Sequence, residues 1–322
     1  MLTRALIACL IACLLLTAYL WTSVNLKPRA VPLGVAAPEP VAQQLEAALD
    51  QAVPGGFDVR PVADADRARA LIQERELYGA VVIGADGIGL LTASAASAPV
   101  ARALETLPQR LAAAPGAEPG AQAQVTVEDV APLPAADPNG AAFVMLVIIT
   151  AVVGLVSGVI TALTVRGRGR RFAAALACGA AVGLVAGLIA GPWLGVVGGS
   201  YWANAGLVAL AAAAVALAVA GVHSAVGAPG IPLIALLVFG GNPFSGAQGG
   251  PLLVPGGWAE LGQALPPGAF SSALRSAAYF DGQGIWGPVA VLCAWAAAGA
   301  LALALGRRAR AAAEAGRAAP GN

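Results

Sequence analysis

The residues that could do chemistry are few, and most of them gather in residues 240–286, called here the outer segment. Its first half overlaps the stretch 239–258, which has no charge but is rich in glycine and proline, so an ordinary membrane helix is not expected there. The outer segment also contains side chains that can form hydrogen bonds and a single cationic residue, Arg275. The candidate functional residues are Asn242, Pro243, Phe244, Arg275, Tyr279 and Asp281.

Catalytic and metal-binding patterns are weak. The one histidine, His223, has no acid or thiol near it in sequence. Cys9 and Cys13 are one helical turn apart, which suits either a metal pair or two small buried apolar residues; without a further ligand nearby, the second reading is favoured. The glycine run at 84–89 lacks the lysine of a phosphate-binding loop. The sequence predicts no enzyme and no cofactor, with ATP used only through a partner subunit.

The composition is that of an integral membrane protein, with 58% hydrophobic and 11% charged residues and a mean hydropathy of +0.78. Uncharged runs predict six membrane spans, at 5–22, 141–165, 172–197, 203–222, 227–239 and 287–305. A cleaved signal peptide is the alternative for the first run, but its length favours an anchor over 1–22. The spans contain no Asp, Glu, Lys or Arg, which argues against an ion-coupled carrier.

Residues 23–140 have a different composition, with fourteen acidic and eight basic residues. Apolar strand patterns alternate with helical ones, and Asp86-Gly87 is a turn signal between two apolar runs. This region therefore predicts an α/β domain. The remaining regions are a five-helix membrane domain over 141–306, which includes a re-entrant-like outer segment, and a basic tail over 307–322.

Arginine placement predicts the orientation. One cluster lies in the connection 166–171, a second in the tail 307–317, and Arg4 precedes the first span. If the chain crosses the membrane six times, both arginine clusters and Arg4 lie on the same side of the membrane. Both termini are then cytoplasmic, and the α/β domain and the outer segment are extracytoplasmic in a multi-pass cell-membrane protein.

Two helical patterns carry further expectations. Glycines recur every four positions along the third span and predict close helix packing, either within the chain or at a dimer interface; they are Gly179, Gly183, Gly187, Gly191 and Gly195. Residues 268–280 can form a short helix with one apolar side, suited to a shallow position in the outer leaflet, with Arg275 facing water or lipid headgroups.

The order of anchor, outer domain, five spans and broken outer connection resembles the permease subunits of type-2 ABC exporters. The stretches 76–105, 241–246 ("GNPFSG"), 265–282 and 286–303 are similar, more narrowly, to actinobacterial membrane proteins of the phage-infection-protein-like group. The resemblance implies a homodimeric permease that exports an apolar or amphipathic substrate with a separate cytoplasmic ATPase. Such permeases usually present a coupling helix to that ATPase, whereas the cytoplasmic loops expected here are short.

Two functions stay open at this point. One is the permease-like subunit, with a cytoplasmic ATPase, a second copy of the chain and membrane lipid as partners. The other is a non-transporting envelope protein whose outer domain, about 27–134, folds alone and binds a ligand or an envelope component. Neither requires a nucleic acid.

Overall fold

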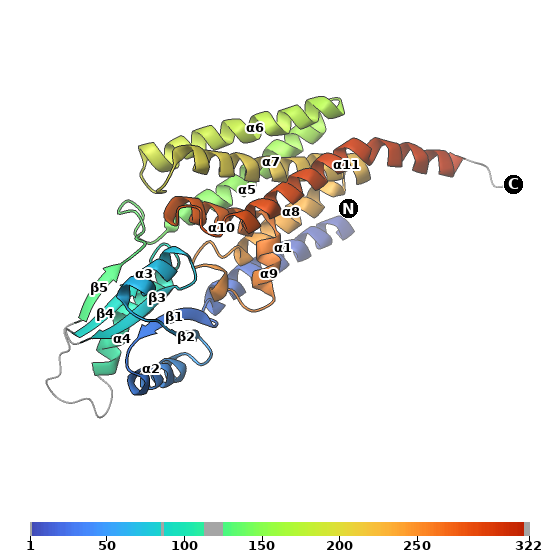
Figure 1. The fold of residues 1–322 in the computed structure, drawn as a ribbon. Coiled ribbons are helices and arrows are strands. Elements are labelled where there is room, and N and C mark those ends of the chain that lie inside the picture. Colours follow the sequence, from blue (N-terminus) through green and yellow to red (C-terminus); the bar gives the residue numbers. More distant parts are fainter. Residues whose placement is uncertain (1, 85–86, 113–124, 319–322) are drawn as a thin grey trace.

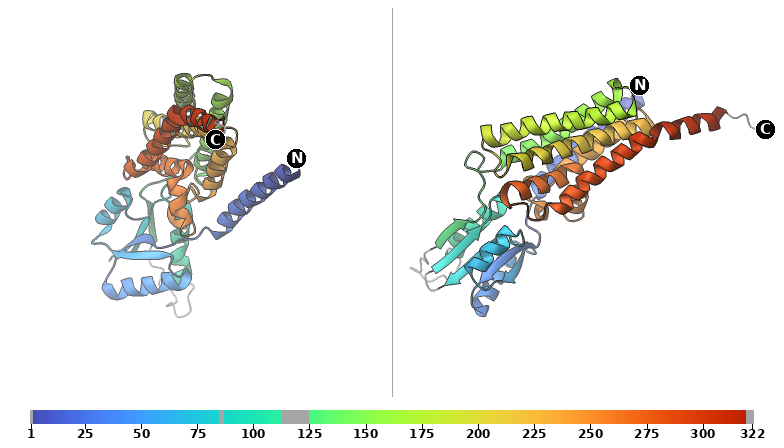
Figure 2. Two further views of the ribbon diagram at one scale, coloured as in Figure 1. Left: turned by 90° about the vertical axis from the view of Figure 1, so that its right-hand side faces the viewer. Right: turned by 45° about the horizontal axis from the view of Figure 1, so that its top comes forward.

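The computed structural model describes residues 2–84, 87–112 and 125–318. An α/β domain sits at one end of a bundle of apolar helices, and both chain termini lie toward the other end (Figures 1 and 2). In the chain, the domain lies between the first bundle helix, α1 (Leu2–Asn25), and the second, α5 (Ala141–Thr164). The mostly helical architecture agrees with the fold class expected from the sequence.

The sheet of the α/β domain has five strands in the order β2-β1-β3-β4-β5. Strands β1 (Val31–Ala36) and β2 (Phe57–Pro61) are parallel, as are β1 and β3 (Gly79–Gly84). Strand β4 (Gly87–Thr92) pairs antiparallel with β3 and parallel with β5 (Val125–Asp129). The hairpin predicted from the turn signal is therefore confirmed.

Each face of the sheet has its own apolar core. Helices α2 (Glu39–Ala52) and α4 (Ala98–Ala112) cover one face, and α3 (Ala65–Gln73) covers the other. The outer segment contributes to both cores, with Leu253 on the first face and Phe280 on the second. Since both side chains are almost fully buried, residues outside the predicted range 23–140 add to the two cores of the domain.

Four helical stretches in the described residues are long and apolar enough to cross a membrane. They are α5, α6 (Arg168–Leu188) with its continuation η1 (Ile189–Trp193), α7 (Tyr201–Val226), and 286–306 of α11 (Trp286–Ala318). Two shorter apolar stretches are Ala12–Asn25 in α1 and Gly230–Phe244. The latter joins α8 (Gly230–Gly241) to η2 (Asn242–Phe244) and is about 22 Å long, less than the roughly 30 Å of a hydrocarbon core.

Helix α7 forms the centre of the bundle and packs against α5, α6, α8 and α11. Its alanines let neighbouring backbones approach closely. A Cβ atom added to Gly183 of α6 would lie 2.3 Å from the Ala205 carbonyl oxygen, and one added to Gly158 of α5 would lie 2.8 Å from the Ala216 Cα atom. These contacts are possible only because glycine has no side chain.

The predicted glycine ridge divides into two parts. Gly179, Gly183 and Gly187 are buried against α7, so their packing is within the chain. Gly191 lies in the π-helical turn η1, and Gly195 lies beyond it with a φ of +63°. The five glycines therefore do not form one continuous helical groove, because the helix ends before the last of them.

The apolar part of α11 ends at Gly306, but the helix itself continues beyond it. Helix α11 continues from the apolar part through to Ala318, so residues 307–318 extend the last helix by about 18 Å instead of forming a separate tail. The last four residues of the predicted tail lie outside the described residues.

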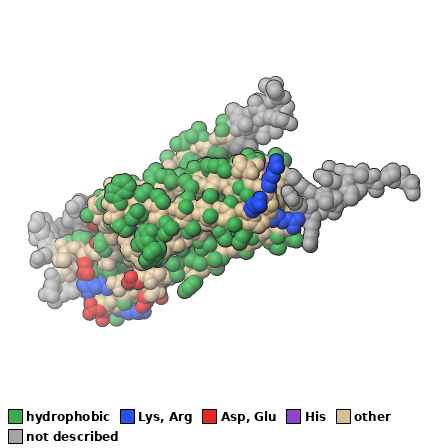
Figure 3. Space-filling view, turned by 90° about the horizontal axis from the view of Figure 1, so that it is seen from above, with side chains coloured by type: hydrophobic (Ala, Val, Ile, Leu, Met, Phe, Trp, Pro, Cys, Tyr) green, Lys and Arg blue, Asp and Glu red, His purple; other side chains and the backbone are tan. Residues whose placement is uncertain are grey.

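The surface reflects this layout. Hydrophobic side chains cover the helices, Lys and Arg gather at the end away from the sheet, and mixed charges cover the domain (Figure 3). Exposed tryptophans mark the helix ends nearest the domain: Trp193, Trp202 and Trp286 are each more than 70% exposed.

Candidate functional site

The outer segment folds into short helices between the bundle and the α/β domain. After η2 come η3 (Pro251–Leu253), α9 (Trp258–Ala264) and α10 (Pro266–Tyr279). Helix α10 is buried along nearly its whole length, in contact with α7, α11, α5 and the domain. The prediction of a shallow helix at the membrane surface is therefore wrong, because both sides of α10 have protein partners.

Arg275 of α10 is a deeply buried charged residue between the bundle and the α/β domain, with 5% exposure. Its guanidinium donates hydrogen bonds to the carbonyl oxygens of Ala95 (3.0 Å), Gly246 (3.4 Å) and Ala247 (2.9 Å). It also lies 4.8 Å from the ring centroid of Phe143 in α5. The expectation that Arg275 faces water or headgroups is thus wrong, since one side chain joins the domain, the outer segment and the bundle.

In the part of the chain that the structure describes, the charge of Arg275 has no acidic partner. Among the described residues, none of the ion pairs includes Arg275 or its neighbour Arg75. Burial lowers the pKa of Arg275 to about 10, and the positive charge of Arg75 acts in the same direction. The carbonyl oxygens therefore replace water as the partners of the cation.

Arg275 fixes the loop 245–249 by bonding two of its carbonyl oxygens. The same loop is bonded by α9, where the Gln263 Nε2 donates to the Ser245 oxygen over 3.0 Å. Ser272 of α10 in turn donates to Gln263 Oε1 over 2.6 Å. These hydrogen bonds make the loop conformation depend on α9 and α10.

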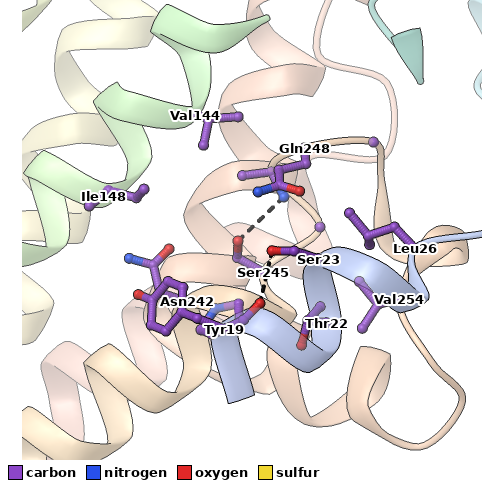
Figure 4. A pocket seen from close by; sticks show the side chains of 14 residues that line it. Tyr19, Thr22, Ser23, Leu26, Val144, Ile148, Asn242, Ser245, Gln248 and Val254 are labelled. Carbon is purple, nitrogen blue, oxygen red and sulfur yellow. Dashed lines mark hydrogen bonds between the residues drawn. The ribbon is translucent and has the colours of Figure 1, made fainter. Parts of the chain in front are cut away.

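A small pocket lies beside this loop, where α1 approaches α5 (Figure 4). Its volume is about 40 Å³, which suits a small polar group and not a whole ligand. Thr22, Ser23, Asn242, Ser245 and Gln248 supply polar groups, and Val144 and Ile148 of α5 form an apolar wall.

Asn242 provides a hydrogen-bond donor that has no acceptor within the described part of the chain. The residue is 6% exposed, and its side-chain Nδ2 is buried without a partner. The neighbouring hydroxyls donate within their own helix, Thr22 to the Ala18 oxygen (2.7 Å) and Ser23 to the Tyr19 oxygen (2.8 Å), and neither accepts from Asn242. A buried, unpaired amide is costly unless a ligand or water accepts from it.

The structure brings most of the candidate residues to this junction. Asn242 and Pro243 line the pocket, and Phe244 stacks on Trp258 with ring centroids 4.7 Å apart. Tyr279 donates to the Val196 oxygen over 3.4 Å, and burial raises its pKa to about 12. Asp281 is exposed, with a φ of +47°, and it takes no part in the pocket.

Several residues of the junction carried no signal in the sequence. Arg75 and Tyr78 follow α3, Gln263 lies in the short helix α9, and Gln248 lies in the loop 245–249. Only the tertiary fold brings Arg75 and Tyr78 beside the outer segment, to which Gln248 and Gln263 belong. Arg75 also has a positive φ (64°), which the residues around it in the sequence do not predict.

Comparison with known proteins does not place the chain in a family: no family model, no curated protein and no solved structure matches it.

Proposed function

We propose that this protein is the permease-like subunit of an ABC-type exporter, working as a homodimer with a separate cytoplasmic ATPase, and that it moves an apolar or amphipathic substrate across the cell membrane. The observation that carries the proposal is the pocket at α1 and α5, which combines an apolar wall with the unpaired amide of Asn242. An amphipathic molecule offers both an apolar chain and a hydrogen-bond acceptor.

The placement of α1 supports access from the bilayer. This helix packs mainly on η2 and α8, and it stands apart from the other bundle helices (Figure 2). Leu10, Leu14, Leu16 and Leu20 are each about 60% exposed. A substrate chain can lie along this apolar surface while its polar group enters the 40 Å³ pocket.

The membrane orientation belongs to the same proposal. Tryptophans favour the membrane–water interface, and arginines favour cytoplasmic connections. Trp193, Trp202 and Trp286 lie at the helix ends beside the α/β domain, whereas Arg166 and Arg168 lie at the opposite end. The domain is then extracytoplasmic and both termini are cytoplasmic, with α1 and α8 completing six crossings.

The same orientation limits the surface left for an ATPase. The cytoplasmic connections would be 165–167 and 227–229, together with the extension of α11 beyond Gly306. The basic extension 307–318 is the longest of these elements, so we assign the ATPase contact to it.

Orientation can be tested by labelling single cysteines in whole cells with a membrane-impermeant thiol reagent. In a background whose native cysteines are replaced, we expect Arg60→Cys on β2 to be labelled and Arg168→Cys on α6 to be labelled only after the cells are opened. The reverse pattern would overturn the orientation.

The function is tested by purifying the tagged protein from its native membrane in mild detergent and identifying co-purified proteins by mass spectrometry. We expect a stoichiometric ATPase whose activity in liposomes depends on this protein. Asn242→Leu should reduce that dependence, whereas Gln43→Leu, which alters an exposed amide on α2, should not. Recovery of the protein alone, or only with itself, would contradict the proposal.

The alternative is an envelope protein that binds a ligand without transporting it. The short connections 165–167 and 227–229 favour this alternative, because they offer little surface to an ATPase. Its expectation of an independently folding domain is weakened by Leu253 and Phe280, which complete the two cores of the domain. Soluble, monodisperse expression of residues 27–134 would support the alternative.

A further inference from the structure

A second cavity, separate from the pocket at α1, lies between the α/β domain and the outer segment. Its volume is about 310 Å³, large enough for several ligand atoms. Arg75 and Tyr78 line it from the domain, Gln263 and Ser272 from α9 and α10, and Pro288 from the first turn of α11.

Arg75 gives the cavity a positive charge. One terminal nitrogen of its guanidinium donates to the Ser276 hydroxyl and, over 3.5 Å, to the Ser272 oxygen. The other guanidinium nitrogens of Arg75 make no hydrogen bond to any described residue. Their N–H groups are therefore available to a ligand. Its cationic group lies 5.3 Å from the ring centroid of Phe280, which holds the side chain in place.

The charges around the cavity are unbalanced. Arg275 lies close enough for its charge to act on Tyr78, and no ion pair among the described residues engages Arg75 or Arg275. Burial lowers the pKa of Arg75. Glu74 is the one acid among the described residues that line the cavity; its side chain is 45% exposed and lies 3.7 Å from Arg67.

The cavity also lies at a level that suits a lipid headgroup. Gly284 and Pro288 line it on either side of Trp286, which is 80% exposed at the start of α11. Tryptophan at such a helix end favours the headgroup region. Arginine is suited to phosphate because its planar guanidinium can donate two parallel hydrogen bonds.

We propose that the Arg75 cavity binds a phosphate group, supplied by an anionic phospholipid headgroup at the outer membrane surface. Gln263 and Ser272 line the space beside the guanidinium and offer polar contacts to the headgroup. This site does not depend on transport and would exist equally in a non-transporting envelope protein.

The test uses the full-length protein in mild detergent and counts bound lipid by native mass spectrometry. We expect phosphatidylglycerol to bind in preference to phosphatidylcholine, with one preferred molecule per chain. Arg75→Gln should weaken this binding about tenfold, the effect of losing a charged hydrogen bond. Arg60→Gln, which removes an exposed arginine on β2, should leave it unchanged.

A second variant, Glu74→Gln, is expected to strengthen the binding of phosphatidylglycerol, whereas Arg75→Gln weakens it. It removes an exposed negative charge at the cavity without removing a buried contact, so the protein should fold and bind phosphatidylglycerol several-fold more tightly. This variant keeps the proposal testable even if Arg75→Gln fails to fold.

A parallel measurement separates the two sources of phosphate. If inorganic phosphate raises the melting midpoint of the wild-type protein but not of Arg75→Gln, and phosphatidylglycerol shows no preference, the site binds phosphate from solution. Equal binding of the two lipids, with no effect of inorganic phosphate, would overturn the proposal. So would unchanged lipid binding in both Arg75→Gln and Glu74→Gln.

Discussion

The two most enclosed helices of the molecule, α7 and α10, are held in different ways. Helix α7 packs through alanines against glycines of α5, α6 and α11, and its contacts are almost entirely apolar. Helix α10 buries Arg275 together with Ser271, Ser272 and Ser276, and it is held by hydrogen bonds as well as apolar contacts.

The comparison separates a fixed part of the molecule from an adjustable one. Backbone contacts through glycine leave no room for movement, because any shift either opens a void or produces a clash. Hydrogen bonds from one guanidinium to three carbonyl oxygens can be exchanged for others when a loop moves. A ligand-responsive element is therefore expected at α10 and the loop 245–249, and not along α7.

The largest effect is expected when the glycine packing of α7 is broken. In Gly183→Leu, a side chain would have to occupy the place of the Ala205 carbonyl, so α6 and α7 must separate. Overpacking of this kind costs about 3 kcal/mol or more, and we expect little monodisperse protein in detergent. Gly206→Leu is the matched control, because Gly206 has open space around it. Equal yields from the two variants would contradict the tight packing.

A smaller effect is expected when the polar junction is broken. Arg275→Met keeps most of the volume but removes three hydrogen bonds. We expect the melting midpoint in detergent to fall by about 5–10 °C while the protein still folds. Arg275→Lys should recover only part of this loss, since an ammonium group cannot reproduce the planar fork. A midpoint equal to that of the wild type would show that the junction does not depend on this side chain.

The smallest effect concerns the outer surface of the α/β domain. Arg69 of α3 bonds the Glu128 carboxylate of β5 at 2.7 to 3.2 Å, and this hydrogen bonding lowers the pKa of Glu128 below its ordinary value of 4.5. Because the pKa is lower in the folded state, the stabilisation is complete above pH 4.5 and is lost as the pH falls through the folded value.

We therefore expect the melting midpoint of the wild type to fall more steeply below pH 4.5 than that of Glu128→Gln. The effect is small because the pair is exposed and screened by solvent. Parallel curves for the two proteins would show that the ion pair contributes nothing.

The sequence predicts the apolar parts of this fold well for a physical reason. Val31, Leu33 and Val35 alternate along β1, and the turn signal before β4 marks the hairpin, so local patterns determine these elements. The spacing of Gly179, Gly183 and Gly187 likewise predicts their close packing, although not the identity of the partner helix.

The junction could not be predicted because its contacts join distant parts of the chain. The Ala95 oxygen that accepts from Arg275 is 180 residues away, and the Ala247 oxygen is 28 away. The polar side of α10 is typical of a helix that faces water, and sequence alone does not distinguish water from backbone carbonyl oxygens as its partner. Arg75 and its cavity could not be predicted for the same reason, because the cavity is lined by residues that are distant in the sequence.

The central claim is that the pocket at α1 and α5 selects an amphipathic molecule. The most direct test places a photo-crosslinking amino acid at Ile148, in the pocket wall, and separately at Ile149, which is 55% exposed on the same helix. After illumination in native membranes, adducts are identified by mass spectrometry. We predict that position 148 captures one amphipathic species in excess, while position 149 captures lipids in their bulk proportions. The same bulk lipids at both positions would contradict the claim.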